Sequence, residues 1–462
     1  MEHLTIDLPE DVLFEILLSI NITDVVNMVV SNKTLKAVLS KPQFLNQMAV
    51  VHGLPFSETF VQMLRYSKLT PCNLMKLAVN SEDMRVINRL NEYNGSRFSY
   101  NRVMEFAARS GSQDIVDKML LFGVKDYNRS MLKAARNGHH AIVNQMIKLG
   151  ADDYDQAMAE ASEGGHRDIV NHMLELKADD YVRSMMAAAR GGHREIVDQM
   201  LFIGADDING DYDDVMIEAA SGGHQEIVNQ MIDLGISNIV SYNHAMVDAT
   251  RGNHQAIVNQ MIALGANAYN GAMEMAAWNG HQDIINQMLR LNADDYNGAM
   301  KYAAKGGHQA IVDQMLALKA DDYNSAMAAA AESGHQDIVN QMLALKADDY
   351  NSAMANAARG GQQAIIDQML RLGANNYYET MASAALSGYQ AIVDQMVVLS
   401  FDPDNYDPAN YNKALINASR GGYQPIVNQM LLLGADDYRH ALGIAENWYH
   451  QDIVDQMSSL IK

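Results

Sequence analysis

Two short apolar patterns alternate along most of the chain, and each has the period of an α-helix. The first places small and apolar side chains on one side of a helix, as in Tyr323, Ala326, Met327, Ala330 and Ala331. The second follows a break at Gly334 and predicts a wide apolar face made by Ile338, Val339, Met342, Leu343 and Leu345. Each helix would have about ten residues, fewer than the ~12–15 at which an isolated helix becomes even marginal in water. We therefore expect every helix to depend on its neighbours.

This helix pair is the unit of a repeat. The isoleucine that opens the second apolar face recurs as Ile115, Ile142, Ile169, Ile196, Ile227, Ile257, Ile284, Ile311, Ile338, Ile365, Ile392, Ile426 and Ile453. Most steps are 27 residues, and three are 31, 30 and 34. The additional residues fall in 208–214, 236–243 and 401–412, each between the second helix of one unit and the first helix of the next. One pattern repeated throughout predicts an all-α solenoid instead of separate cores.

The repeat divides the chain into three parts. Residues 101–462 hold about thirteen units. Residues 51–100 form a connector and a degenerate capping repeat with Val86 and Ile87 in the marker position, since terminal repeats commonly diverge. Residues 1–50 have a different helical pattern. Within a unit, Asp322 is an N-cap candidate, Gly334 suits a C-cap, and Asp337 lies in a first turn, where the helix dipole favours a carboxylate.

The second half of each unit resembles the ankyrin repeat, as in "GHHAIVNQMIKLGAD" (138–152) and "GYQPIVNQMLLLGAD" (422–436). The resemblance covers about residues 101–462 and implies helix-turn-helix units that bind proteins. Two departures matter, because the unit is shorter than the family's 33 or so residues and Y-N-x-A-M replaces its T-P-L-H opening. The shorter unit implies that the family's projecting β-hairpin fingers are reduced to a tight "ADDY" turn.

Residues 1–50 resemble the F-box, in which a Leu-Pro pair opens an amphipathic helix and an aspartate opens a second one. The matching residues are Leu8, Pro9, Asp11, Val12, Leu13, Ile16, Leu17, Asp24, Val25, Lys33 and Phe44. The family's Cys-Lys-x-Trp is degraded to "SNKTL" here. The resemblance implies docking on the Skp-type adaptor of a cullin-RING ubiquitin ligase through Leu8, Pro9, Val12, Leu13, Ile16 and Leu17. An F-box-like segment before ankyrin-like repeats is also similar to proteins of large DNA viruses. The alternative is a helical cap that covers the open end of the solenoid.

Net charge and cysteine content restrict which partners, disulfides and metal sites are possible. The formal net charge is −22, from 56 acidic and 34 basic residues, so the surface repels phosphate backbones and nucleic acid is not an expected partner. Cys72 is the one cysteine, which excludes an internal disulfide and a cysteine-based zinc cluster. No secretory signal and no apolar run of about 20 residues is present. We expect a cytoplasmic or nuclear protein, in a host cell if the chain is viral.

Nine histidines stand three residues before the marker isoleucine: His139, His166, His193, His224, His254, His281, His308, His335 and His450. Equivalent positions in adjacent units lie about 10 Å apart, whereas zinc needs its nitrogens about 2 Å from a shared ion. We predict that these imidazoles bond backbone at the inter-helix turn and hold no metal. Gln362, Tyr389 and Tyr423 replace histidine in three units, which agrees with a structural role.

The other residues that look chemical also have structural explanations. The Asp-Asp pairs, such as Asp152-Asp153 and Asp294-Asp295, lack the spacing of calcium loops and recur where helices need caps. The methionine of each "QM" is expected in the core. No nucleophile elbow, P-loop or dinucleotide fingerprint appears. We therefore expect no enzyme and no cofactor.

Positions that differ between units are the candidates for binding, since packing constrains the constant ones. Just after the first-helix alanines the series runs Arg136, Glu163, Arg190, Ser221, Arg251, Trp278, Lys305, Glu332, Arg359, Leu386 and Arg420. One turn earlier Lys133, Glu160, Met275, Tyr302 and Asn356 vary similarly. Exposed aromatics are common anchors, so the candidate target-binding residues are Met275, Trp278, Tyr302, Arg190 and Arg251. The alternative is neutral drift of a solvated face.

These patterns predict a protein-binding scaffold. The leading hypothesis is a substrate-recruiting adaptor, whose N-terminal helices bind the Skp-type adaptor and cullin while the repeats hold a target protein. The alternative is an ankyrin-like binding or sequestering protein with no link to ubiquitin.

Overall fold

The computed structural model describes residues 100–204, 212–402, 407–448 and 450–461. The chain divides into two compact units, Met1–Ile236 (unit 1) and Ser237–Lys462 (unit 2), and each is described by itself. Within the described ranges every regular element is a helix and no strand occurs, which confirms the predicted all-helical repeat solenoid. The F-box-like residues 1–50 and residues 51–99 of the predicted connector lie outside the described residues, as does Cys72, and Tyr100 already belongs to the first described helix.

The described helices form thirteen consecutive pairs. In unit 1 they are α8 (Tyr100–Ser110), α9 (Gln113–Leu121), α10 (Tyr127–Arg136), α11 (His140–Lys148), α12 (Tyr154–Gly164), α13 (Arg167–Glu175), α14 (Tyr181–Gly191), α15 (Arg194–Gly204), α16 (Tyr212–Gly222) and α17 (Gln225–Asp233). In unit 2 they are α18 (Ile239–Arg251), α19 (Gln255–Ala263), α20 (Tyr269–Asn279), α21 (Gln282–Arg290), α22 (Tyr296–Gly306), α23 (Gln309–Ala317), α24 (Tyr323–Ser333), α25 (Gln336–Ala344), α26 (Tyr350–Gly360), α27 (Gln363–Arg371), α28 (Tyr377–Ser387), α29 (Gln390–Ser400), the 3-10 helix η3 (Pro408–Tyr411), α30 (Asn412–Gly421), α31 (Gln424–Leu432), α32 (Tyr438–Asn447) and α33 (Gln451–Ile461). None of these helices is long and apolar enough to span a bilayer.

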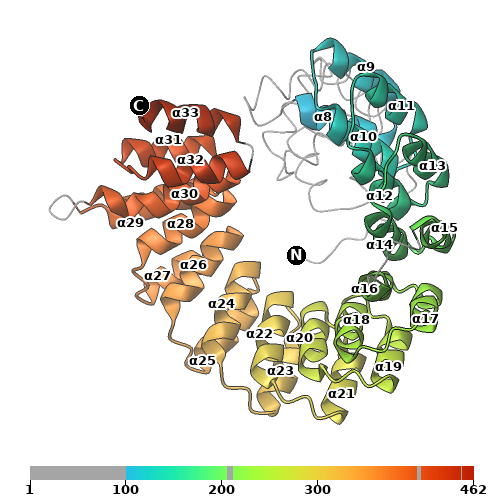
Figure 1. Ribbon diagram of the computed structural model, residues 1–462. Helices are drawn as coiled ribbons and strands as arrows, with labels where there is room; N and C mark the ends of the chain where they lie inside the picture. Colours follow the sequence, from blue (N-terminus) through green and yellow to red (C-terminus); the bar gives the residue numbers. More distant parts are fainter. Residues whose placement is uncertain (1–99, 205–211, 403–406, 449, 462) are drawn as a thin grey trace, which may run out of the picture. The chain divides into compact units, whose positions relative to one another are not determined.

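The even-numbered first helices pack side by side, and the odd-numbered second helices lie behind them (Figure 1). Alanine makes this possible, because Ala326, Ala330 and Ala331 are fully buried between neighbouring first helices and add little bulk. The backbones of neighbouring second helices approach each other less closely than those of neighbouring first helices, and polar side chains bridge them. Within each unit the array therefore bends with the first helices on its inner side.

The core comes mainly from three positions of each second helix and a methionine of each first helix. Ile338, Val339 and Met342 are buried, as is Met327, which confirms the core role of the "QM" methionine. The predicted wide apolar face is wrong at its edge, because Leu345 is 37% exposed. Leu345 is the C-cap residue of α25 and therefore lies past the end of its apolar face.

The predicted caps are confirmed. The Asp322 carboxylate accepts a hydrogen bond from the backbone N–H of Ser325 and caps α24, and Asp337 lies in the first turn of α25. Gly334 ends α24 with φ of +83°, a left-handed conformation that glycine adopts without strain. The pattern of first-helix cap, left-handed turn and second helix then repeats in the next unit.

Two rows of polar side chains connect successive units, and sequence analysis did not anticipate them. The Asn297 amide oxygen accepts from the backbone N–H groups of Asp321 (2.8 Å) and Asp322 (3.0 Å), which fixes the turn of the next unit. On the second helices, Gln309 donates to Gln341 at 2.7 Å, and Gln341 donates to Asp313 at 2.7 Å. The recurrent Asn of "YN" and Gln of "QM" therefore connect successive units of the repeat.

Candidate functional site

A third row of contacts uses the recurrent histidines. Nε2 of His308 donates to the backbone carbonyl of Trp278, in the preceding unit, at 3.0 Å. The same contact, at 3.0–3.2 Å, is made by His139, His193, His224, His281 and His450. These carbonyls end the first helices, where no helical partner is available. The predicted backbone role is confirmed at these positions, and the bond joins one unit to the one before it.

The histidine row also explains a constant glycine. Gly280 has φ of +79°, and a Cβ placed there would lie 2.6 Å from the ring of His308. The ring thus fills the space that a larger residue would take. The described residues contain no group of three histidine, cysteine, aspartate or glutamate side chains arranged to hold a metal ion. Burial lowers the pKa of His166, although its backbone hydrogen bond to Arg136 acts in the opposite direction.

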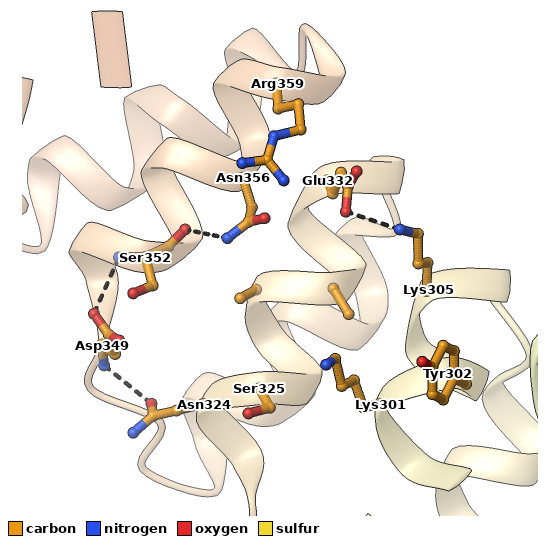
Figure 2. A pocket seen from close by; sticks show the side chains of 12 residues that line it. Lys301, Tyr302, Lys305, Asn324, Ser325, Glu332, Asp349, Ser352, Asn356 and Arg359 are labelled. Atoms are coloured by element: carbon orange, nitrogen blue, oxygen red, sulfur yellow. Dashed lines mark hydrogen bonds and ion pairs between the residues drawn. The ribbon is translucent and has the colours of Figure 1, made fainter. Parts of the chain in front are cut away.

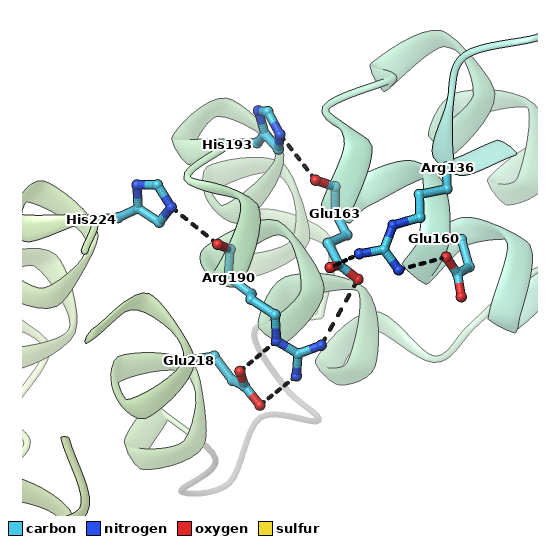
Figure 3. A network of polar contacts seen from close by, with 7 residues as sticks. All are labelled: Arg136, Glu160, Glu163, Arg190, His193, Glu218 and His224. Atoms are coloured by element: carbon cyan, nitrogen blue, oxygen red, sulfur yellow. Dashed lines mark hydrogen bonds and ion pairs between the residues drawn. The ribbon is translucent and has the colours of Figure 1, made fainter. Parts of the chain in front are cut away.

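The recurrent Asn, Gln and His side chains are engaged between units. The side chains at the variable positions of the first helices are left to face the solvent. In unit 1 these positions carry charges that pair with each other (Figure 3). The Arg190 guanidinium makes two hydrogen bonds to the Glu218 carboxylate, at 2.7 and 2.6 Å, and lies 3.8 Å from Glu163. Arg136 pairs with both Glu160 and Glu163. The hydrogen bond to Glu218 is the main cause that raises the pKa of Arg190.

In unit 2 the corresponding positions of α20 and α22 carry an aromatic and cationic cluster, formed by Trp278, Tyr302 and Lys305. The Trp278 and Tyr302 ring centroids are 6.2 Å apart, and Lys305 Nζ lies 5.9 Å from the Trp278 ring centroid. Trp278 remains 41% exposed. An exposed indole beside a cation is a suitable anchor for a protein partner.

The other residues predicted from the sequence to bind a target lie in different surroundings. Met275 is half-buried on α20, one turn before Trp278. Arg251 ends α18 and forms a salt bridge with Asp248 at 3.3 Å. Arg190 belongs to unit 1, where its charge is already paired. The structure therefore brings Trp278 and Tyr302 together as one cluster and leaves both arginines engaged within their own surfaces. The adaptor-binding candidates Leu8, Pro9, Val12, Leu13, Ile16 and Leu17 lie outside the described residues.

Next to the cluster is a pocket of about 450 Å³, lined by residues of α22, α24 and α26 (Figure 2). Its rim includes Tyr302, Lys305 and Arg359, and Ala328 and Ala329 contribute to its wall. Lys305 pairs with Glu332 at 3.1 Å across the opening. The pocket was not predicted from the sequence, although a signal was present, because α24 has alanine at positions 328 and 329, where α22 has Lys301 and Tyr302.

A carboxylate pair borders the cluster on its other side. Burial raises the pKa of Glu274, and the hydrogen bond and negative charge of Asp295 raise it further, while Lys301 acts in the opposite direction. Lys301 therefore lies within electrostatic range of the Glu274 carboxyl group. The Lys301 ammonium lies 5.7 Å from the Tyr302 ring centroid.

Comparison with known proteins identifies part of the repeat. The profile of a family described as "Ankyrin repeats (3 copies)" matches residues 273–354, which run from α20 to α26. A search of curated proteins gives no match.

Solved structures give only distant likenesses. The pentatricopeptide repeat protein PPR10 from maize is 14% identical, over 98% of this chain and 91% of that chain, with a TM-score of 0.24. The same protein in complex with an 18-nt psaJ RNA element is 13% identical, over 98% and 92%, with a TM-score of 0.21. A circular tandem repeat protein is 14% identical, over 98% and 95%, with a TM-score of 0.12. Scores this low carry no argument about a ligand. The described residues form an all-helical repeat solenoid, and the match of residues 273–354 to ankyrin repeats indicates a protein-binding scaffold.

Proposed function

We propose that the protein recruits a target protein through the first-helix face of unit 2 and presents it to a cullin-RING ubiquitin ligase. The observation that carries the target-binding part is the cluster of Trp278, Tyr302 and Lys305. Its aromatic rings stay accessible although the constant polar side chains around them are engaged between units. Binding energy in protein interfaces is concentrated in such aromatic and cationic anchors.

The adaptor part of the proposal rests on the F-box resemblance alone. In it, Leu8, Pro9, Val12, Leu13, Ile16 and Leu17 form the surface that binds the Skp-type adaptor. The chain itself is not an enzyme in this proposal and needs no cofactor, so its partners supply the ubiquitin chemistry. The place of action is the cytoplasm or the nucleus, in a host cell if the chain is of viral origin.

The test is direct binding of the purified full chain to a purified Skp-type adaptor, measured by isothermal titration. The wild type should bind, and a Leu8→Ala, Pro9→Ala double variant should lose binding while keeping its circular dichroism spectrum. Trp278→Ala is the matched control, since it alters the target-binding cluster and should leave adaptor affinity unchanged.

If the folded wild type does not bind the adaptor, the ubiquitin link fails. The function then reduces to the alternative, a binding or sequestering protein whose N-terminal helices only cap the solenoid.

A further inference from the structure

The pocket of unit 2 exists because of a local change in side-chain size. At two successive positions of α22 stand Lys301 and Tyr302, and the same positions of α24 hold Ala328 and Ala329. Two methyl groups therefore replace two long side chains in the row, and both alanines line the space of about 450 Å³. Pockets that hold small ligands or a few side chains have volumes of ~300–1,000 Å³.

Some charged side chains around this pocket have a partner within the chain, and others form no salt bridge. Lys305 pairs with Glu332 at 3.1 Å, and the Asp349 carboxylate accepts from the backbone N–H of Ser352 at 3.0 Å as the cap of α26. Both carboxylates of the lining are thus engaged by the chain itself. Lys301 and Arg359 also line the pocket, and neither forms a salt bridge with any described residue.

Lys301 and Arg359 are distinguished by their place in the lining of this pocket. The chain has a net charge of −22, so its surface favours basic partners nearly everywhere. Among the lining residues three cations accompany two carboxylates, and Lys301, which also interacts electrostatically with Glu274, and Arg359 share the lining with two alanines. The complementary ligand carries negative charge at its ends and little bulk between them.

We propose that this pocket binds an acidic segment of the target protein, whose carboxylates pair with Lys301 and Arg359 while a small or apolar side chain covers Ala328 and Ala329. The Arg359 guanidinium can hold a carboxylate with two parallel hydrogen bonds, and the Trp278 and Tyr302 rings extend the contact along the row. This inference rests on the proposed function and adds the chemistry of the partner.

A protein segment fits better than a nucleic acid. Two open cations can neutralise only two phosphates, and the acidic surface of the chain repels the remainder of a phosphate backbone. Carboxylates on a short segment need only local complementarity, which the pocket supplies.

The first experiment selects ligands without assuming a target. A random peptide library displayed on phage is selected on the immobilised full chain and, in parallel, on the Arg359→Glu variant. Peptides enriched on the wild type over the variant should contain an excess of aspartate and glutamate. The most enriched peptide is then synthesised and titrated by fluorescence anisotropy.

Matched variants separate the pocket from its surroundings. Arg359→Glu should weaken binding by about tenfold or more, whereas Arg420→Glu, at the same helix position outside the pocket, should change it by less than about twofold. Ala328→Ile fills the pocket and should weaken binding similarly. Its control is Ala355→Ile on α26, at the same helix position but outside the lining, and isoleucine already occupies that position in α30 as Ile416. Thermal unfolding by circular dichroism checks that all four variants fold.

Several results would overturn the inference. They are a selection without acidic enrichment, a selection with no peptide preferring the wild type, or equal losses in the pocket variants and their controls. An oligouridine RNA that displaces the peptide and depends on Arg359 would assign the pocket to nucleic acid instead. Adaptor binding through Leu8 and Pro9 is measured separately and should be unaffected by Arg359→Glu, so failure here is distinguishable from failure of the proposed function.

Discussion

The same first-helix positions carry a network of paired charges in unit 1 and, in unit 2, both paired charges and an exposed aromatic ring. In unit 1 these positions hold Arg136, Glu163 and Arg190, whose charges satisfy one another across successive helices. In unit 2 they hold Trp278 and Arg359, which leave an aromatic ring and a cation accessible. The comparison teaches that the repeat fixes only the scaffold, and that a surface becomes available for binding where the variable residues do not pair with each other.

The largest expected loss of stability follows from substitution at a core position that the two units share. Met173 in unit 1 and Met342 in unit 2 occupy the same second-helix position, and both are fully buried. Met173→Ala and Met342→Ala should each lower the free energy of unfolding by about 2–5 kcal/mol, because each leaves a cavity. Urea unfolding followed by circular dichroism measures both. A large loss in one unit only would contradict a common scaffold.

A smaller effect should distinguish the two faces. Arg190→Ala removes a two-point ion pair within a charge network and should lower the free energy of unfolding by about 1 kcal/mol, whereas Arg359→Ala should change it by only a few tenths. The effect of Arg190→Ala should decrease at high salt, since salt screens exposed charges. A double-mutant cycle with Glu218→Ala isolates the pair, and a coupling energy near zero would show that unit 1 gains nothing from its network.

The amino-acid sequence predicts the helical scaffold but not the difference between the paired charges of unit 1 and the aromatic cluster of unit 2. The constant residues predict the helix pairs, the Asp322 cap and the left-handed Gly334, because each of these features depends on local chemistry. The pairing of Arg190 with Glu218 depends on which position of one helix faces which position of the next, and that follows from the packing offset between units. For the same reason Arg190 could be proposed as a target-binding residue while its guanidinium is in fact held by Glu218. The pocket was missed because alanine, as the commonest first-helix residue, looks like packing wherever it occurs.

The two units should also respond to pH in opposite directions. In unit 2 the pKa of Glu274 is raised, so the folded protein prefers its protonated form, and stability is lost as pH rises through the ordinary carboxyl range towards the raised value. Glu274→Gln should therefore raise the Tm at neutral pH, and the gain should disappear below about pH 4. Differential scanning calorimetry across this range provides the measurement. A gain that persisted at low pH would mean that carboxylate charge is not its cause.

The smallest expected effect on the Tm is that of a histidine in unit 1. Burial lowers the pKa of His166, so the folded protein prefers the neutral ring, and stability present above about pH 6.5 is lost as pH falls towards the lowered value. His166→Gln copies the residue found at Gln362 and should remove this loss between about pH 7 and pH 5. Equal pH dependence of the Tm in wild type and variant would contradict the role assigned to the half-buried ring of His166.

The most direct test of the account asks which face meets a partner. A photoreactive benzoylphenylalanine is placed at position 302 in unit 2, and separately at position 133, the same first-helix position in unit 1. After irradiation of cells that express each protein, the account predicts a defined covalent protein adduct from position 302 that is absent from position 133 and is lost on Arg359→Glu. Adducts of equal yield from both positions, or from position 133 alone, would contradict the assignment of target binding to unit 2.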